Sequence, residues 1–326
     1  MEGAGFEPAK HEAADLQSAG FDRSPTPPSI KKSGQFCCPE NTLSTKLKRF
    51  VMLLARMSKK NQNLVKHEIT KVLSKINKES LIEIILLERI QSTNDEAKKR
   101  LNKLQKTDDC LAVFAEQQDS GRGRDGKKWQ SPSKVNIYLS FSWASGFKPN
   151  ELDGLSLGVA VEISKSLKPL LGEEIKIKWP NDLFLSEKKV GGILVETSKR
   201  KNGTNIIIGV GLNVLMSDKN ISIDQDWTSL SLHYGKHFDR SLIAGYLLES
   251  LLNLKANFAI KGFDYYRSDF EKLHLLKNQK CLVTLEDQII IGVVTGISEV
   301  GELIIKEGRK IHTLRFGEVS VKKIDA

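Results

Sequence analysis

Three segments of the chain combine positive charge with glycine or with a rigid turn, which suits them to contact a phosphate or a carboxylate. Segment 121–129 reads GRGRDGKKW, where glycines let backbone amides approach an anion and arginine offers a planar fork of donors. Lys178 ends an alternating segment just before a turn that carries Asp182, a carboxylate suited to hold a divalent cation beside phosphates. Lys189 precedes two glycines that leave open space above a strand. Together the three segments indicate anion binding.

Each segment also has an ordinary structural explanation. Segment 121–129 could be a surface loop or a nucleic-acid tether, segment 178–182 an Asn-Asp turn beside a buried tryptophan, and segment 189–192 a simple hairpin. The pattern GxxxxGK[ST] of a P-loop is absent, and the six histidines include no HExxH spacing. No Ser/His/Asp arrangement is apparent. Cations and amides without a nucleophile favour a reaction that positions two substrates and neutralises phosphate charge, as in phosphoryl or nucleotidyl transfer.

Composition limits the class of protein but does not identify its partner. The formal net charge of +10 is compatible with nucleic acid or with a phosphorylated ligand. The chain has no apolar run of the roughly 20 residues that span a bilayer, so we expect no membrane association. The cysteines lack CxxC spacing, which favours reduced thiols in a cytoplasmic protein; they are Cys37, Cys38, Cys110 and Cys281.

Periodic apolar patterns predict the elements that must position these segments. In VNIYLSFSW at 135–143, apolar side chains alternate with asparagine, tyrosine and serine, which indicates a half-buried strand. Thr93 with Glu96 forms a capping-box pattern, so the ordinary explanation of this stretch is a helix start. Further strands are predicted at 81–90, 174–182, 189–196 and 205–214. Helices are predicted from Leu64 to Ile76, in a charged run ending at Leu104, and at 151–168 and 240–258.

These elements divide the chain into four parts. Residues 1–60 hold five of the nine prolines and show no sustained period, so we expect either a disordered tail or a working protein that begins at Met52 or Met57. Residues 61–80 are a short helical lead-in, and residues 81–272 form an α+β domain. In residues 275–326, short apolar runs broken by glycines predict a small β-barrel.

Taken in order, the motifs resemble those of the biotin protein ligase family, biotin–[acetyl-CoA-carboxylase] ligase. The matching residues are Ser92-Thr93-Asn94, Gln118, GRGR at 121–124 with Trp129, KWPND at 178–182, KVGGILVE at 189–196 and GVGLNV at 209–214. Each motif is weak alone, but the series in the family's order is specific, and it runs from about residue 81 to the C-terminus. The resemblance implies a class II synthetase-like α+β domain, with a mixed or antiparallel sheet and helices on one face, followed by an SH3-like β-barrel.

The resemblance also implies a two-step reaction that uses ATP, biotin and Mg²⁺. The biotin carboxylate attacks the α-phosphate of ATP to give biotinyl-5′-AMP and pyrophosphate. A lysine of a biotin carboxyl carrier protein then attacks the mixed anhydride, which is needed because a free carboxylate is a poor acyl donor. The residues implied to be catalytic are Arg124, Lys189 and Asp182.

Individual positions take their expected roles from the same resemblance. The biotin pocket is implied to be lined by Ser92, Thr93, Asn94 and Gln118. The loop over the carboxylate and the phosphate is implied to consist of Arg122, Gly123 and Arg124, with Trp129 nearby. Biotin is implied to contact Lys189, Gly191 and Gly192, and the ATP phosphates with Mg²⁺ to contact Lys178, Asn181 and Asp182. Asn213 and Arg240 are implied to support the adenylate or pyrophosphate, and Trp227 to cover the adenine.

Some features depart from the family pattern or leave alternatives. Asp119 and Asp125 place negative charge on either side of the loop arginines, which weakens the positive field there. The stretch 57–80 is too short for the winged helix-turn-helix of family members that repress transcription, so we expect no specific DNA binding. A lipoate ligase is one alternative, although its arginine-serine-triple-glycine motif is absent. A basic nucleic-acid-binding protein is another. We expect a monomer or a homodimer.

Overall fold

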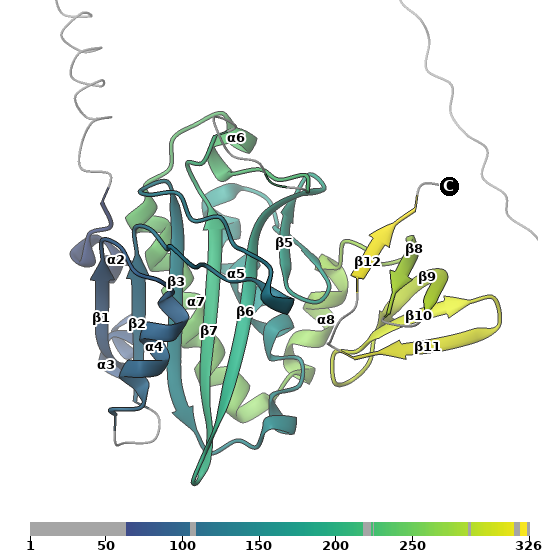
Figure 1. Ribbon diagram of the computed structural model, residues 1–326, viewed down its shortest axis with the longest axis horizontal. Coiled ribbons are helices and arrows are strands. Elements are labelled where there is room, and N and C mark those ends of the chain that lie inside the picture. Colours follow the sequence, from purple (N-terminus) through teal and green to yellow (C-terminus); the bar gives the residue numbers. More distant parts are fainter. Residues whose placement is uncertain are drawn as a thin grey trace, which may run out of the picture. The chain divides into compact units, whose positions relative to one another are not determined.

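A seven-stranded sheet forms the centre of the computed structural model, which describes residues 63–104, 109–217, 223, 225–285, 288–315 and 320–324 (Figure 1). Its order is β1-β2-β3-β7-β6-β5-β4. β1 and β2 run parallel and the other neighbours run antiparallel, so the predicted mixed sheet is confirmed. The strands are β1 (Leu81–Leu87), β2 (Cys110–Ala115), β3 (Asn136–Ser145), β4 (Lys176–Lys178), β5 (Asp182–Leu185), β6 (Lys188–Arg200) and β7 (Gly203–Asn213). The tail predicted at 1–60 lies outside the described residues.

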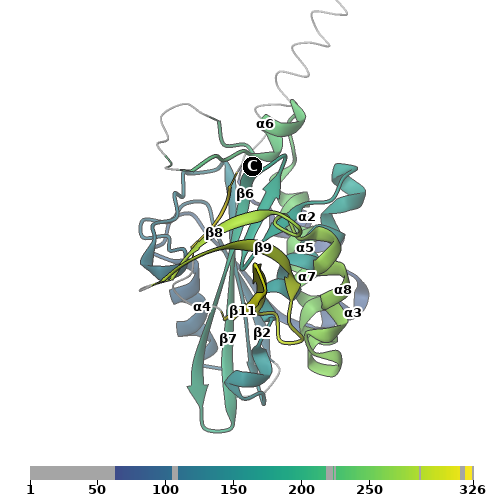
Figure 2. The same cartoon turned by 90° about the vertical axis from the view of Figure 1, so that its right-hand side faces the viewer.

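Helices cover both faces of this sheet, with the long helices on one side (Figure 2). On that side α5 (Leu155–Leu171) packs against β6 and α7 (Arg240–Lys261) packs against β3, backed by α2 (Lys66–Val72) and α8 (Asp264–Leu273). The short helix α4 (Thr93–Leu101) lies on the opposite face, where Ala97 packs against Leu111 and Val113. The prediction of helices on one face therefore holds for the long helices, and α4 covers part of the other. Another short helix of this region is α6 (Leu230–Tyr234).

The strand β3 is buried on both faces, although its alternation predicts a half-buried strand. Ile137 and Leu139 lie in the main core, as predicted. Ser140 and Ser142 on the other side are also buried, because α4 packs over that face. The enclosed polar face provides hydrogen-bonding groups inside the protein, which must find partners there or bind a ligand.

The helix predicted from Leu64 to Ile76 is wrong, because this stretch forms two short helices. α2 ends at Val72, and α3 (Lys75–Ser80) starts after Ser74. Ser74 has an extended backbone, and its hydroxyl accepts a hydrogen bond from the amide of Asn77 at 3.4 Å. This N-cap begins a new helix and leaves the Ile76 side chain exposed.

Two other helix starts differ from prediction for local reasons. α4 is capped by Ser92, whose hydroxyl accepts a hydrogen bond from the amide of Asp95, so Thr93 is not the N-cap. The helix predicted from residue 151 begins at Leu155, because Gly154 has a left-handed backbone with φ of 75°. The helix predicted at 240–258 is confirmed as α7.

The C-terminal part of the chain forms a five-stranded antiparallel sheet, which agrees with the small β unit predicted for 275–326. Its order is β11-β10-β9-β8-β12, and the strands are β8 (Lys280–Thr284), β9 (Ile289–Ile297), β10 (Leu303–Glu307), β11 (Lys310–Leu314) and β12 (Ser320–Lys323). The indole of Trp179 joins the two sheets by donating to the carbonyl of Gly301 at 3.0 Å. The domain boundaries themselves stay predictions. Among the described residues, no helix is long and apolar enough to cross a bilayer.

His274 follows α8 directly, and its backbone pairs with Ile177 of β4. Its ring is buried against Phe270, with the ring centroids 4.9 Å apart. Within the described part of the chain, neither ring nitrogen has a hydrogen-bond partner. Burial therefore lowers the pKa of His274 from 6.5 to about 4, since the imidazolium would lose its hydration.

We expect the free energy of unfolding to rise between pH 4 and pH 6.5, because the unfolded state holds the His274 proton more tightly than the folded state. The free energy of unfolding should be about 3 kcal/mol higher above the unfolded-state pKa of His274 than below its folded-state pKa. This stability is lost as the pH falls toward the folded-state pKa. Urea unfolding at a series of pH values measures the slope. His274→Leu should flatten the curve, whereas His237→Leu, which removes an exposed histidine, should not. An unchanged slope in His274→Leu would contradict the assignment.

Candidate active site

A cleft of about 770 Å³ opens on the face of the sheet that carries α4. Its walls come from the N-terminus of α4, loop 121–130, turn 178–182, strands β6 and β7, and β12 of the C-terminal sheet. Of the predicted site residues, the lining includes Ser92, Thr93, Asn94, Gln118, Arg122, Gly123, Arg124, Trp129, Lys178, Asn181, Asp182, Lys189 and Gly192. The fold thus brings segments that are distant in the sequence to one place.

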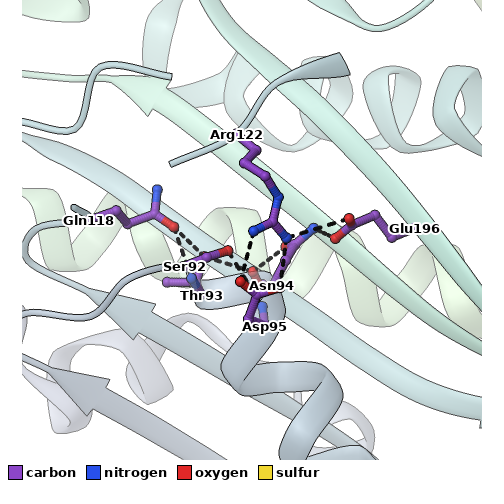
Figure 3. Close-up of polar contacts among 8 residues, drawn as sticks. Ser92, Thr93, Asn94, Asp95, Gln118, Arg122 and Glu196 are labelled. Atoms are coloured by element: carbon purple, nitrogen blue, oxygen red, sulfur yellow. Dashed lines mark hydrogen bonds and ion pairs between the residues drawn. The ribbon is translucent and has the colours of Figure 1, made fainter. Parts of the chain in front are cut away.

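The N-terminus of α4 and the buried polar face of β3 form a hydrogen-bonded floor in this cleft. The amide and the hydroxyl of Thr93 donate to Oε1 of Gln118 at 2.9 and 3.0 Å (Figure 3). The hydroxyl of Ser140 lies 2.8 Å from the Thr93 hydroxyl and 2.5 Å from Oδ1 of Asn94. The side-chain amide of Gln118 continues the network by donating to Ser131 at 3.1 Å. Such neutral donors and acceptors match an uncharged polar group such as an amide or a urea.

Glycines on β6 and β7 let two side chains lie directly on the strands. A Cβ atom on Gly211 would lie 2.5 Å from the Trp129 ring, and one on Gly192 would lie 3.2 Å from it. A Cβ atom on Gly209 would lie 2.6 Å from Oδ1 of Asn94. Larger residues at these positions would push the Trp129 ring and the Asn94 amide out of place. The Trp129 ring therefore forms an apolar wall beside the polar floor.

Lysines gather at the other end of the cleft. Nζ of Lys189 lies 2.7 Å from Oδ1 of Asp182, and it also lies 5.5 Å from the centroid of the Trp129 ring. The half-buried Lys178 has a lowered pKa because burial disfavours its charged form, an effect that nearby Asp182 opposes. Lys322 of β12 lines the same end. This cluster of cations is suited to bind carboxylate or phosphate groups.

Loop 121–129 folds back on itself as a short hairpin beside the cleft. The amide of Gly123 donates to the carbonyl of Lys127 at 2.7 Å, and the amide of Trp129 donates to the carbonyl of Gly121 at 2.9 Å. Asp125 at its tip has a left-handed backbone and an exposed side chain. The hairpin gives a glycine-rich segment a defined path, with Arg124 and Trp129 on the cleft lining.

Two acidic residues near the loop form ion pairs that the sequence does not reveal. Asp119 pairs with Arg89 at 2.8 Å and so is not an isolated negative charge. Arg122 donates two hydrogen bonds of 2.7 Å to the carboxylate of Asp95 (Figure 3). This contact holds the pKa of Asp95 below its ordinary value. The predicted weakening of the loop's field by Asp119 is therefore offset locally by Arg89.

Two predicted positions, Gly191 and Asn213, do not line the cleft. The space above Gly191 is filled by the carbonyl of Gly211 and the side chain of Leu183, on the core side of the sheet. Gly191 pairs with Leu183 and Gly192 pairs with Asp182, and because consecutive residues of a strand point to opposite faces, Gly192 faces the cleft. The amide of Asn213 is buried and donates to the carbonyl of Thr228 at 3.0 Å. Neither residue belongs to the cleft lining, and their ligand contacts stay predictions.

Arg240 and Trp227 also lie off the cleft lining. Arg240 is buried at the start of α7, where Nη2 lies 2.6 Å from Glu116 and Nε donates to the carbonyl of Asn136 at 3.0 Å. A buried arginine with these partners is held within the protein, and its support of an adenylate stays a prediction. The backbone at Trp227 pairs with Lys189, so this segment supports the lysine from beside the strand.

Two further residues of this region were not predicted. Ser140, a buried partner of Thr93 and Asn94, could have been found, because it lies on the polar face of a predicted strand. Lys322 could not, because it belongs to a different sheet and carries no motif of its own.

The fit of a divalent cation depends on Asp182. Among the described residues, no group of three or more His, Cys, Asp or Glu side chains could hold a metal ion. Mg²⁺ is commonly bound by one or two carboxylates together with substrate phosphates, so a single carboxylate beside lysines still fits a nucleotide-bound ion. Asp182 is the predicted ligand that lines the cleft.

Comparisons with known proteins agree with the motifs. Residues 86–213 match the Biotin/lipoate A/B protein ligase family, and residues 278–322 match the Biotin protein ligase C terminal domain. The bifunctional ligase/repressor BirA of Escherichia coli (strain K12) is 34% identical over 244 residues, which cover 74% of this chain and 75% of that protein. The biotin–[acetyl-CoA-carboxylase] ligase of Mycobacterium tuberculosis is 30% identical over 217 residues, which cover 65% of this chain and 79% of that protein.

A solved structure shows a similar fold. The biotin protein ligase from Aquifex aeolicus in complex with biotin and ATP has a TM-score of 0.63 and 28% identity, with 74% of this chain and 99% of that chain covered. The matched families span the central sheet and the C-terminal sheet, and the relatives cover most of the described residues. The chain belongs to the biotin protein ligase family.

Proposed function

We propose that the chain is a ligase that activates biotin as biotinyl-5′-AMP with ATP and then transfers biotin to a lysine of a biotin carboxyl carrier protein. The observation that carries this proposal is one cleft in which a neutral hydrogen-bonding floor adjoins a lysine cluster and an arginine-bearing loop. Biotin has this same division between an uncharged ureido ring and a carboxylate. The relative from Aquifex aeolicus was solved with biotin and ATP, which supports the proposal.

In the proposed first step, the floor orients the ureido ring and the lysine end meets the carboxylate. Thr93, Asn94 and Gln118 offer donors and acceptors for the ring. Lys189 and Arg124 reduce the repulsion between the biotin carboxylate and the α-phosphate as the two anions approach. A carboxylate oxygen bonds to the α-phosphorus, and pyrophosphate leaves.

Before ligands bind, the ion pair between Lys189 and Asp182 keeps both groups in the cleft. Lys189 would then turn to the biotin carboxylate while Asp182 holds Mg²⁺ with the ATP phosphates. The metal ion would supply further charge neutralisation at the phosphates. Lys178 and Asn181 border the same turn and support the phosphate end.

In the proposed second step, the acceptor lysine of the carrier attacks the anhydride carbonyl, and AMP leaves. Water competes for the same carbonyl, so the adenylate must be covered until the carrier arrives. Loop 121–129 is placed to provide this cover. We propose that the reaction takes place in the cytoplasm, with the carrier protein as partner and without specific DNA binding or membrane contact.

The test is incubation with ATP, Mg²⁺, biotin and a carrier domain, followed by mass spectrometry of the carrier. The carrier should gain one biotinyl group, and a carrier with arginine at the acceptor lysine should gain none. A parallel reaction with lipoate in place of biotin tests the alternative function, a lipoate ligase. A mass increase with lipoate but not with biotin would favour that function. No mass increase with either acid would overturn both proposed activities.

Lys322 gives a separate prediction about the C-terminal sheet. Lys322→Ala should weaken ATP binding about fivefold and change biotin binding little, because the residue lines the cleft at the lysine end, where its charge acts on Lys178. Calorimetric titration with ATP and with biotin measures both affinities. Lys323→Ala is the matched control, since Lys323 pairs with Glu187 at 2.9 Å and does not line the cleft. Equal losses in the two variants would argue against a local role for Lys322.

A further inference from the structure

The guanidinium of Arg122 lies between two carboxylates at the edge of the cleft (Figure 3). Nη1 and Nη2 each donate a hydrogen bond of 2.7 Å to Asp95, and Nη2 also lies 3.6 Å from Glu196. A bidentate pair of this kind fixes the plane of the guanidinium as well as its position. Arg122 is therefore held in one place by groups of the protein itself.

Both carboxylates belong to elements that build the cleft floor. Asp95 lies in the first turn of α4, next to Asn94. Glu196 of β6 accepts a hydrogen bond from Nδ2 of Asn94 at 2.6 Å. The loop is thus fastened to the same helix turn and strand that would bind the polar end of a ligand.

The hairpin shape of the loop carries this attachment to its tip. Arg122 pairs across the hairpin with Lys128, and the amide of Gly123 is bonded to the carbonyl of Lys127. Because the two arms are joined, holding Arg122 also restricts Arg124, two residues further along. The two arginines of the motif therefore occupy different environments.

We propose that Asp95 is a positioning residue that latches loop 121–129 over the cleft before any ligand binds. Arg122 serves as the anchor of the loop, and Arg124 is the loop arginine that contacts the reacting anion. Because the latch orders the loop before binding, the ligand does not lose affinity through the entropic cost of ordering it. The effect on catalysis rests on the proposed ligase function, whereas the latch itself does not.

The latch must also open to admit ligands, and its exposure allows this. The side chains of Asp95 and Arg122 are 56% and 36% exposed, so salt weakens their attraction. A pair of this exposure favours the closed loop by about threefold to fivefold. The loop is therefore closed most of the time in dilute salt and opens often.

Limited trypsin digestion of the ligand-free full chain tests the latch directly, because the loop offers cleavage sites after Arg122, Arg124, Lys127 and Lys128. Cleavage after the last three is compared, because Arg122→Gln removes the first site. Asp95→Asn should be cut there about threefold to fivefold faster than the unmodified protein at low salt. Raising the salt concentration should speed cleavage of the unmodified protein toward the rate of the variant. Intact-mass analysis of the fragments identifies the sites.

Glu96→Gln is the matched control, since Glu96 lies in the same helix turn but pairs with Arg100 at 2.6 Å. It should be cut at the rate of the unmodified protein. Arg122→Gln and the double variant with Asp95→Asn complete a cycle, and the double variant should be cut no faster than either single variant. Equal loop cleavage in Asp95→Asn and Glu96→Gln, or fully additive effects, would overturn the latch.

A second readout connects the latch to the ligase. Asp95→Asn should release biotinyl-5′-AMP about threefold to fivefold faster, with Glu96→Gln unchanged. If the unmodified protein forms no adenylate while the proteolysis result holds, the proposed function fails and the latch stands. If adenylate forms but Asp95→Asn changes neither cleavage nor release, the latch fails and the function stands.

Discussion

Lys189→Ala should weaken biotin binding by about 1.5–3 kcal/mol, the value of one charge-assisted hydrogen bond to the carboxylate. The lysine lies in the cleft with a side chain only 14% exposed, so water can replace it poorly. The variant also leaves the Asp182 carboxylate without its lysine partner, which adds repulsion against the biotin carboxylate. Isothermal titration with biotin in the absence of ATP measures the loss without contributions from chemistry.

Lys188→Ala is the control for this experiment, because Lys188 precedes Lys189 on the same strand and its side chain is exposed. Its biotin affinity should match that of the unmodified protein. Lys189→Met keeps the apolar stem without the ammonium and should resemble Lys189→Ala, which separates charge from packing. Unchanged biotin affinity in Lys189→Ala would remove this lysine from the site.

Arg124→Gly should still form biotinyl-5′-AMP but release it about 10- to 100-fold faster, because one charge-assisted contact of about 1.5–3 kcal/mol to the adenylate is lost. Arg124 lines the cleft near the tip of the hairpin, so its loss removes charge where the loop meets the anion. The added glycine also loosens the loop and admits water. Rapid dilution of preformed adenylate, with quantification of the free intermediate, measures the release rate.

Two comparisons separate charge from flexibility in this prediction. Arg124→Lys keeps the charge but not the planar fork. Its rate of adenylate release should fall between the rates of the unmodified protein and of Arg124→Gly. Arg309→Gly removes an exposed arginine from the turn between β10 and β11, and should leave release unchanged. Adenylate held by Arg124→Gly as tightly as by the unmodified protein would refute the role of this arginine.

Much of the fold followed from local patterns. The strand at 135–143 was predicted from alternation, and the strands at 189–196 and 205–214 from apolar segments that contain glycines. The three lie side by side in the sheet as β3, β6 and β7. Alternation depends on the residues of one strand only, so it can be recognised without knowing which strands lie beside it. Helix boundaries were less certain, because single capping residues such as Ser74 and Gly154 decide them.

The sequence by itself determined the family and the chemical character of the site, because the residue types that bind anions and the spacing within each motif are local properties. The tertiary structure alone decided which members of each motif face the cleft. Gly191 faces the core while Gly192 faces the cleft, and Asp95 in a helix turn that is distant in the sequence binds Arg122. The direction of a side chain depends on strand register, and the partner of a charge depends on which elements pack together, so neither can be read from a motif.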